Sequence, residues 1–179
     1  MNKYLKILIG LLVGLLLFFI VRSIIVGPTP YLDVEFDPKN EIFNYSTIQY
    51  VDTLSHIGLE YLGVDNLNIT VLNAHPHVIR NILPGHTVDG FVVQTDSVSY
   101  QIWMNPSMNR NTMIRILAHE LIHIEQQSSG RLEVISNELA VFEGDTIRTR
   151  QVPYEDRPWE IEAYRNQRKV ERHIRSKVF

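Results

Sequence analysis

The sequence predicts a small α+β domain that follows one N-terminal transmembrane helix. Three observations lead to this fold class: an apolar run near the N-terminus, segments whose apolar residues recur at helical spacing, and short strand-like runs between them. A chain of 179 residues has room for one hydrophobic core rather than two. We therefore expect one sheet packed on two or three helices.

The N-terminal segment, residues 1–26, contains an almost uninterrupted apolar run from Ile7 to Val26. A helix of this length spans roughly 30 Å, the thickness of the hydrocarbon layer of a bilayer. A secretory signal peptide is the alternative, because Lys3 and Lys6 resemble its basic start; the run is long for one, however, and no Ala-x-Ala-type cleavage site follows. We expect an uncleaved anchor that contacts the lipid bilayer through residues 7–26. The basic start favours a domain on the extracytoplasmic side.

Charge and composition exclude several classes of function. Outside the first 26 residues, the chain has 14 Lys and Arg against 20 Asp and Glu, a net charge of −6. Binding to nucleic acid needs clustered basic residues, so we expect no nucleic-acid partner. The absence of cysteine excludes disulfides, iron–sulfur clusters and cysteine zinc sites. Any metal must be held by His, Asp or Glu.

The first half of the domain, residues 31–179, is expected to mix strands with one helix. A linker at 27–30 precedes it, since Gly and Pro cannot continue the anchor helix. Residues 31–36 alternate apolar and acidic side chains, as a strand does, and residues 41–62 have apolar residues three and four apart up to Gly63, as a helix does. The segment LNITVLN predicts a second strand, and residues 74–87, rich in Pro, Gly and His, predict a loop.

The second half predicts a hairpin, two helices and a β-rich segment between them. VDGFVVQ and VSYQIWMN are strand-like runs separated by three polar residues. The strongest helical pattern follows, from about Asn109 to Gln127. Residues 131–152 have β character with a turn near Gly144, and Pro158 begins a last helix that ends near Arg175.

The helix expected at 109–127 carries the motif HELIH, with His119, Glu120 and His123. Residues four apart lie on one helix face, so the two imidazoles can bind one ion. Glu120 borders that face. Two neutral imidazoles and a nearby carboxylate suit zinc: the ion lowers the pKa of its bound water, and the carboxylate takes the proton.

Two histidines on a helix are more often ordinary surface or hydrogen-bonded residues. This helix, however, is apolar on most sides, with eight apolar residues between Met113 and Ile124. Burying two imidazoles and a carboxylate there is costly unless they are satisfied, and a metal with its water would satisfy all three. A Zn²⁺ site is therefore the preferred interpretation.

A catalytic zinc site usually has three protein ligands, so one more is needed. Glu160 and Glu162, at the start of the last helix, are candidates, because a helix N-terminus favours a carboxylate and a small Ala163 would allow close helix packing. The remaining candidates are Glu138, Glu143, Asp145, His75, His77, His86 and His173.

HELIH, followed 37 residues after His123 by Glu160 in the segment RPWEIEAY, resembles the gluzincin branch of the zincin-like metallopeptidases. The resemblance covers about residues 98–168. It implies a zincin-like fold, with a small mixed sheet packed on the active-site helix and flanking helices. It also implies that His119, His123 and Glu160 bind zinc, with Glu162 as the reserve choice. Many relatives have Asp four residues after the ligand Glu, where this chain has Tyr164.

The same resemblance suggests how a substrate would be held. In zincins an edge strand before the active-site helix pairs with an extended peptide, which here would be VSYQIWMN; an ordinary core strand is the alternative. Tyr154, His86 and Tyr164 are candidate donors to the oxyanion. Asn137 and Glu138 could mimic the Asn-Glu pair of some gluzincins, but lie only 14 residues after His123.

The sequence thus predicts a membrane-anchored zinc metallopeptidase that acts on a peptide or protein substrate. Glu120 is its expected general base, which activates the zinc-bound water and passes the proton to the leaving amine. The alternative is a non-catalytic anchored domain that keeps the zincin shape for binding or scaffolding. A purely structural zinc site has no need of Glu120, which favours the enzyme.

Overall fold

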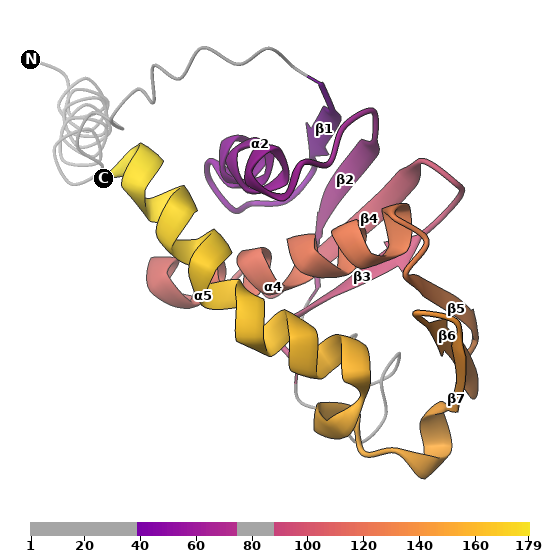
Figure 1. The fold of residues 1–179 in the computed structure, drawn as a ribbon. Coiled ribbons are helices and arrows are strands. Elements are labelled where there is room, and N and C mark those ends of the chain that lie inside the picture. The colour runs from indigo at the N-terminus through magenta and orange to yellow at the C-terminus, as the bar shows by residue number, and fades with distance from the viewer. Residues whose placement is uncertain (1–38, 75–87) are drawn as a thin grey trace, which may run out of the picture. The chain divides into compact units, whose positions relative to one another are not determined.

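The computed structural model describes residues 39–74 and 88–179 (Figure 1). The expected membrane helix at 7–26, the linker at 27–30 and the strand at 31–36 lie outside these residues, as do His75, His77 and His86. A helix of the length and apolar character needed to cross a bilayer is not found in the described part of the chain.

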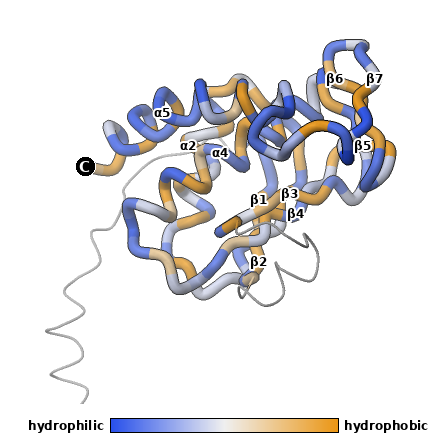
Figure 2. Tube along the Cα trace, turned by 90° about the horizontal axis from the view of Figure 1, so that it is seen from below, coloured by the Kyte–Doolittle hydropathy of each residue, from blue (hydrophilic) through white to orange (hydrophobic). Residues whose placement is uncertain are grey.

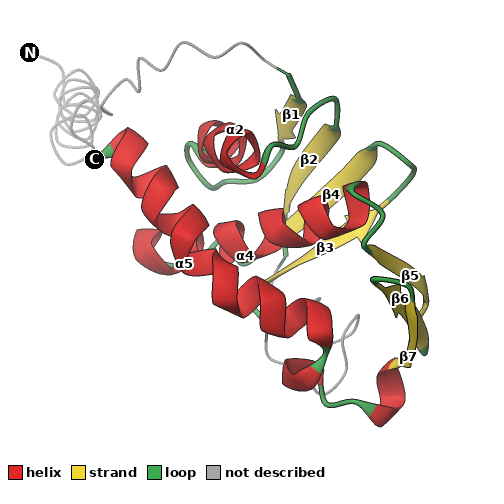
Figure 3. Ribbon diagram, in the orientation of Figure 1, coloured by secondary structure: helices red, strands yellow, loops and turns green. Residues whose placement is uncertain are grey.

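In the described residues, three helices and two sheets form an α+β structure, as predicted (Figure 3). The larger sheet is mixed and has the strand order β1-β2-β4-β3. β1, β2 and β4 are parallel, and β3 is antiparallel to β4, with which it forms the predicted hairpin. The strands are β1 (Glu41–Asn44), β2 (Asn68–Asn73), β3 (Gly90–Gln94) and β4 (Ser99–Met104).

This order corrects one expectation. The run VSYQIWMN was a candidate edge strand, but β4 pairs with β2 on one side and β3 on the other, so it lies inside the sheet. Its alternate residues Tyr100, Ile102 and Met104 are buried in the core. Among the described strands, β3 is the edge next to β4.

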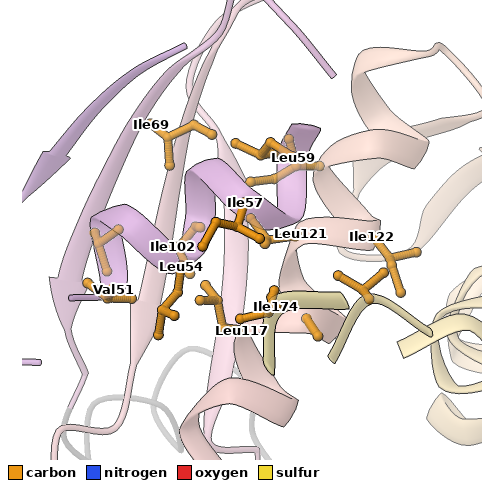
Figure 4. Packing of buried hydrophobic residues seen from close by; sticks show 14 of the residues in the cluster. Val51, Leu54, Ile57, Leu59, Ile69, Ile102, Leu117, Leu121, Ile122 and Ile174 are labelled. Carbon is orange, nitrogen blue, oxygen red and sulfur yellow. The ribbon is translucent and has the colours of Figure 1, made fainter. Parts of the chain in front are cut away.

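The main hydrophobic core lies between this sheet and three helices: α2 (Val51–Leu62), α4 (Arg110–Ser128) and α5 (Pro158–Val178). Figure 4 shows side chains of α2, α4, α5 and the strands packed together, among them Ile57, Ile102 and Leu121. The helices approach closely at Gly58, where an added Cβ would lie 2.3 Å from the Leu121 side chain. α5 contributes only a narrow apolar stripe, which Figure 2 shows as occasional hydrophobic positions along a largely hydrophilic helix.

The helix expected at 41–62 begins ten residues later than predicted, at Val51. Residues 41–44 are instead strand β1, which pairs with β2 in parallel. The side chain of Asn40 explains the difference, because it donates to the Val64 carbonyl at 2.8 Å and accepts from the Leu67 amide at 2.9 Å. These bonds hold the chain extended beside β2. The predicted end at Gly63 is confirmed, with a left-handed φ of 71°.

Most of the β-rich segment expected at 131–152, namely residues 132–148, forms a second, three-stranded antiparallel sheet, where one sheet was expected for the whole domain. Its strands are β5 (Leu132–Ser136), β6 (Leu139–Phe142) and β7 (Asp145–Arg148). The β6–β7 turn contains Glu143 and Gly144, both with positive φ, which matches a two-residue hairpin loop. Two short 3₁₀ turns, η1 (Thr149–Gln151) and η2 (Tyr154–Asp156), lead to α5. A small cluster of Leu132, Ala140, Phe142 and Trp159 packs under this sheet.

Candidate metal centre

Helix α4 carries the HELIH motif in its buried second half. The side chain of Asn109 caps the helix by accepting from the Thr112 amide at 3.0 Å. Apolar residues such as Leu117 and Leu121 fix one side of α4 in the main core. The remaining buried side presents His119 and His123, which are 6% and 7% exposed, toward the start of α5.

Three side chains meet there. The Nε2 atoms of His119 and His123 lie 3.1 Å apart. Glu160 Oε2 lies 3.2 Å from His119 Nε2 and 3.4 Å from His123 Nε2. Glu160 is in the first turn of α5, where the helix dipole favours its negative charge. The three atoms therefore form a nearly equilateral triangle inside the protein.

The size of this triangle fits a zinc ion. In a tetrahedral site with ligands at about 2.0 to 2.1 Å, neighbouring ligand atoms lie about 3.3 to 3.4 Å apart. The observed edges of 3.1, 3.2 and 3.4 Å are close to that spacing. Two imidazoles and one carboxylate are also a donor set that zinc accepts. His119, His123 and Glu160 thus suit a zinc ion that keeps its fourth coordination position open.

Gln126 holds His123 in place and was not predicted. Its amide Nε2 donates to the Trp159 carbonyl at 3.0 Å, and its Oε1 lies 2.8 Å from His123 Nδ1. A carbonyl can only accept, so the amide nitrogen must face Trp159 and the amide oxygen must face the histidine. Nδ1 of His123 therefore carries a proton, and Nε2 is the nitrogen directed at the triangle. Gln126 is fully buried, so water does not compete for its hydrogen bond with His123.

Charges within the triangle shift two pKa values. Burial alone would raise the pKa of Glu160, but hydrogen bonds from His119 and His123 and the charges of both lower it to about 2. Burial would lower the pKa of His123, but its hydrogen bond to Glu160 and the negative charges of Glu160 and Glu120 raise it to about 9. A metal ion would take the place of the proton on Nε2, because a histidine ligand must be neutral.

Glu120 stands beside the triangle without joining it. It is 4% exposed, and among the described residues no hydrogen bond or ion pair engages its carboxylate. Burial raises the pKa of Glu120 above its usual value, against the opposing effect of the two histidines. A carboxylate that is buried, unpaired and of raised pKa has the properties of a general base.

Gly90 makes room for this carboxylate. A Cβ on Gly90 would lie 2.8 Å from the Ile116 side chain, 3.2 Å from the Trp103 carbonyl and 3.3 Å from Glu120 Oε1. Strand β3 can therefore approach α4 at this point only because residue 90 has no side chain. The sequence pattern predicts this glycine only as part of a strand and does not reveal its role beside Glu120.

His119 has a different environment from His123. Its Nδ1 is buried and has no hydrogen-bond partner within the described residues. The ring of Tyr164 lies 4.7 Å from the His119 ring, at an interplanar angle of 47°. Tyr164 thus packs against the imidazole at the position where relatives of the resembled family have Asp.

The other candidate residues lie elsewhere. Glu162 pairs with Arg131 at 2.8 Å, and Glu138 pairs with Arg150 at 2.7 Å. Glu143 lies in the β6–β7 turn, Asp145 is the first residue of β7, and Asn137 lies between β5 and β6. His173 stacks on Tyr61 with ring centroids 4.5 Å apart. Among the described residues, only His119, His123 and Glu160 form a group that could hold a metal ion.

A pocket of about 810 Å³ opens on this group. Glu120, His123 and Glu160 line it, together with Phe91 and Val92 of β3. The opposite wall comes from β5, β6 and the segment 149–157, which includes Tyr154 and Arg157. Of the candidate oxyanion donors, Tyr154 therefore faces the pocket, Tyr164 is not among its lining residues, and His86 lies outside the described residues.

No protein-family model matches the chain, and no curated protein matches it. Its function must therefore be inferred from its own residues and their geometry.

Proposed function

We propose that this chain is a membrane-anchored zinc metallopeptidase of the zincin-like, gluzincin type. The observation that carries the proposal is the buried triangle of His119 Nε2, His123 Nε2 and Glu160 Oε2, with edges of 3.1 to 3.4 Å, beside Glu120, whose carboxylate makes no hydrogen bond or ion pair within the described residues. A site built only to hold a structural ion has no use for Glu120, a second carboxylate that lines the pocket without belonging to the triangle. The apolar run at residues 7–26 supports the anchor and an extracytoplasmic domain.

His119, His123 and Glu160 would hold the zinc ion. When bound, zinc would polarise the scissile carbonyl and lower the pKa of water toward 7. Glu120 takes a proton from the attacking water, and its raised pKa suits it to hold that proton near neutral pH. It then delivers the proton to the amine that leaves, so the peptide bond is hydrolysed with no net change in the enzyme.

Tyr154 is the proposed donor to the oxyanion. It lines the pocket with Glu120 and Glu160. Burial, the negative charges of these two carboxylates and a hydrogen bond to Glu160 raise the pKa of Tyr154 well above its usual value. Its hydroxyl therefore stays protonated and can donate to the negative charge that develops on the substrate.

Strand β3 is the proposed binding edge for the substrate. Among the strands that the structure describes, it is the edge next to β4, and its residues Phe91 and Val92 line the pocket. An extended peptide can add to such an edge through main-chain hydrogen bonds. This assigns to β3 the role that sequence analysis had given to the neighbouring run VSYQIWMN.

Three variants of the full chain test the proposal. Glu120→Gln should keep zinc and lower kcat about 10²- to 10⁴-fold, because only the base is lost. Glu160→Gln should lose zinc, whereas its matched control Glu162→Gln should keep it, because Glu162 pairs with Arg131. Metal content by mass spectrometry and cleavage of a peptide library report the two properties. Undiminished cleavage by Glu120→Gln would show that this carboxylate is not the base, and a zinc-loaded wild type without hydrolysis would favour the scaffolding alternative.

A further inference from the structure

Two arginines line the pocket, and they differ in their partners. Arg150 pairs with Glu138 at 2.7 Å, and the side chains of this pair are 75% and 58% exposed. Arg157 makes no ion pair with any described residue. One of its nitrogens, Nη2, donates to the Thr149 carbonyl at 3.2 Å, while its Nε is buried and has no hydrogen-bond partner in the described part of the chain.

The guanidinium of Arg157 is nevertheless held in place. It lies over the ring of Tyr154, 5.2 Å from the centroid, and 5.9 Å from the ring centroid of Trp159. Together with the bond to Thr149, these contacts limit the conformations open to the side chain. Arg157 directly precedes α5 and lies three residues before Glu160, so it is close in the chain to the metal centre.

An unpaired donor in this position requires an explanation. Within the described residues, the buried side-chain nitrogens and oxygens that lack a partner are His119 Nδ1 and Arg157 Nε, and both belong to residues of the site. Buried polar atoms are almost always hydrogen-bonded, and those that are not tend to mark functional groups. A fixed guanidinium is suited to a planar anion, above all a carboxylate, which it can bind through two parallel hydrogen bonds.

We propose that Arg157 binds a carboxylate of the substrate, so that the pocket selects acidic peptides. This inference rests on the proposed peptidase function and names its substrate class. Glu120 and Glu160 line the same pocket, and a zinc ion would offset their two negative charges, so Arg157 would add a positive charge that attracts an acidic substrate. The carboxylate belongs either to an Asp or Glu side chain or to the C-terminus of the peptide.

The first test varies the substrate. The zinc-loaded full chain is given alanine hexapeptides that carry one Glu or one Gln at each position in turn, each made with a free C-terminus or an amide. A preference for Glu over Gln at one position identifies a side-chain carboxylate, and a preference for the free acid over the amide identifies the C-terminus. We expect kcat/KM to differ about 10- to 100-fold in one of the two comparisons, as for a hydrogen bond to a charged group.

The second test varies the arginine. In Arg157→Gln, kcat/KM for the preferred acidic peptide divided by kcat/KM for its neutral counterpart should fall toward one. Arg157→Lys should keep part of this ratio, since the positive charge remains but the planar guanidinium is lost. The matched control, Arg150→Gln, removes an arginine of the same pocket that already has a carboxylate partner and should leave most of the ratio intact. Binding of the same peptides to the zinc-loaded Glu120→Gln chain measures selection separately from turnover.

The outcomes separate this inference from the proposed function. Hydrolysis of acidic and neutral peptides at equal rates would overturn the role of Arg157 and leave the peptidase standing. Selective binding of the acidic peptides without hydrolysis by the wild type would support Arg157 and overturn the peptidase. If Arg157→Gln fails to fold, the substrate comparisons on the wild type still decide, because they change no residue of the protein.

Discussion

The two hydrophobic clusters that flank the pocket differ in size and in what they support. In the described residues, the main core contains 21 buried side chains from the larger sheet and all three helices. The cluster under the smaller sheet contains four. His119, Glu120 and His123 belong to α4, which is fixed in the main core, whereas much of the opposite pocket wall belongs to the smaller sheet. The proposed base and metal-binding residues of α4 thus lie on the well-packed side together with strand β3, whereas Arg157 and the smaller sheet lie on the lightly packed side.

The same leucine-to-alanine change in each cluster tests this comparison most strongly. Leu121→Ala, at a side chain with 0% exposure, should lower the free energy of unfolding by about 3 to 5 kcal/mol, because the packed surroundings cannot close the cavity. Leu132→Ala, at 4% exposure in the small cluster, should cost about 2 kcal/mol, because pocket residues can relax into the space. Urea unfolding followed by tryptophan fluorescence measures both. Equal losses would show that the smaller sheet is packed as firmly as the main core.

Gln126 connects the well-packed and the lightly packed side of the pocket. Its replacement should have the next largest effect, which is on zinc affinity. It binds His123 on α4 and the carbonyl of Trp159, which belongs to the small cluster. Gln126→Met keeps the shape but removes the side-chain hydrogen bonds to His123, Trp159 and Glu162, so His123 loses the group that fixes its orientation. We expect zinc affinity to fall about 10- to 100-fold, as when a partner of a metal-binding histidine is removed.

Competition with a chelator measures this affinity. Gln127→Met is the matched control, because Gln127 is the next residue of α4 and lines the pocket, yet makes no side-chain hydrogen bond within the described residues. Its zinc affinity should match that of the wild type. An equal fall in both variants would mean that the effect comes from general disturbance of the helix.

Patterns local in sequence predicted the elements that local forces determine. Periodicity located α4 and α5 to within a few residues, and turn residues located the β3–β4 hairpin. The spacing of four residues selected His119 and His123, because helix geometry is displayed directly by a sequence. The third residue stayed open among several candidates, and the resemblance to gluzincins singled out Glu160, which the structure brings together with the two histidines.

The features that were missed depend on contacts between distant residues. Strand β1 has a helix-like spacing of apolar residues, but the bonds of Asn40 to residues 24 and 27 positions away favour the strand. The order of strands in the sheet, which makes β3 rather than β4 the edge, cannot be derived from the strand-like runs alone. Gln126 had one usable signal: it lies three residues after His123, on the same face of α4.

A last variant tests how rigid the well-packed side of the pocket is. It changes Gly90, where we expect the smallest effect. Gly90→Ala places a methyl group 2.8 Å from the Ile116 side chain and 3.3 Å from Glu120 Oε1. The Ile116 side chain can move, but the Trp103 carbonyl at 3.2 Å is backbone and cannot move freely. The methyl group should therefore displace the Glu120 carboxylate slightly and lower kcat about tenfold, because catalysis is sensitive to small errors in position.

Zinc content should not change in this variant, since the three atoms nearest to the added methyl group belong to Ile116, Trp103 and Glu120 and to none of the proposed ligands. Val93→Ala is the control, at a 39% exposed position of the same strand, and should leave kcat close to the wild-type value. Loss of zinc from Gly90→Ala would mean that β3 supports the histidines as well as Glu120. An unchanged kcat would mean that the well-packed side can move enough to accommodate a methyl group. The two sides of the pocket would then differ in the number of buried residues but not in rigidity.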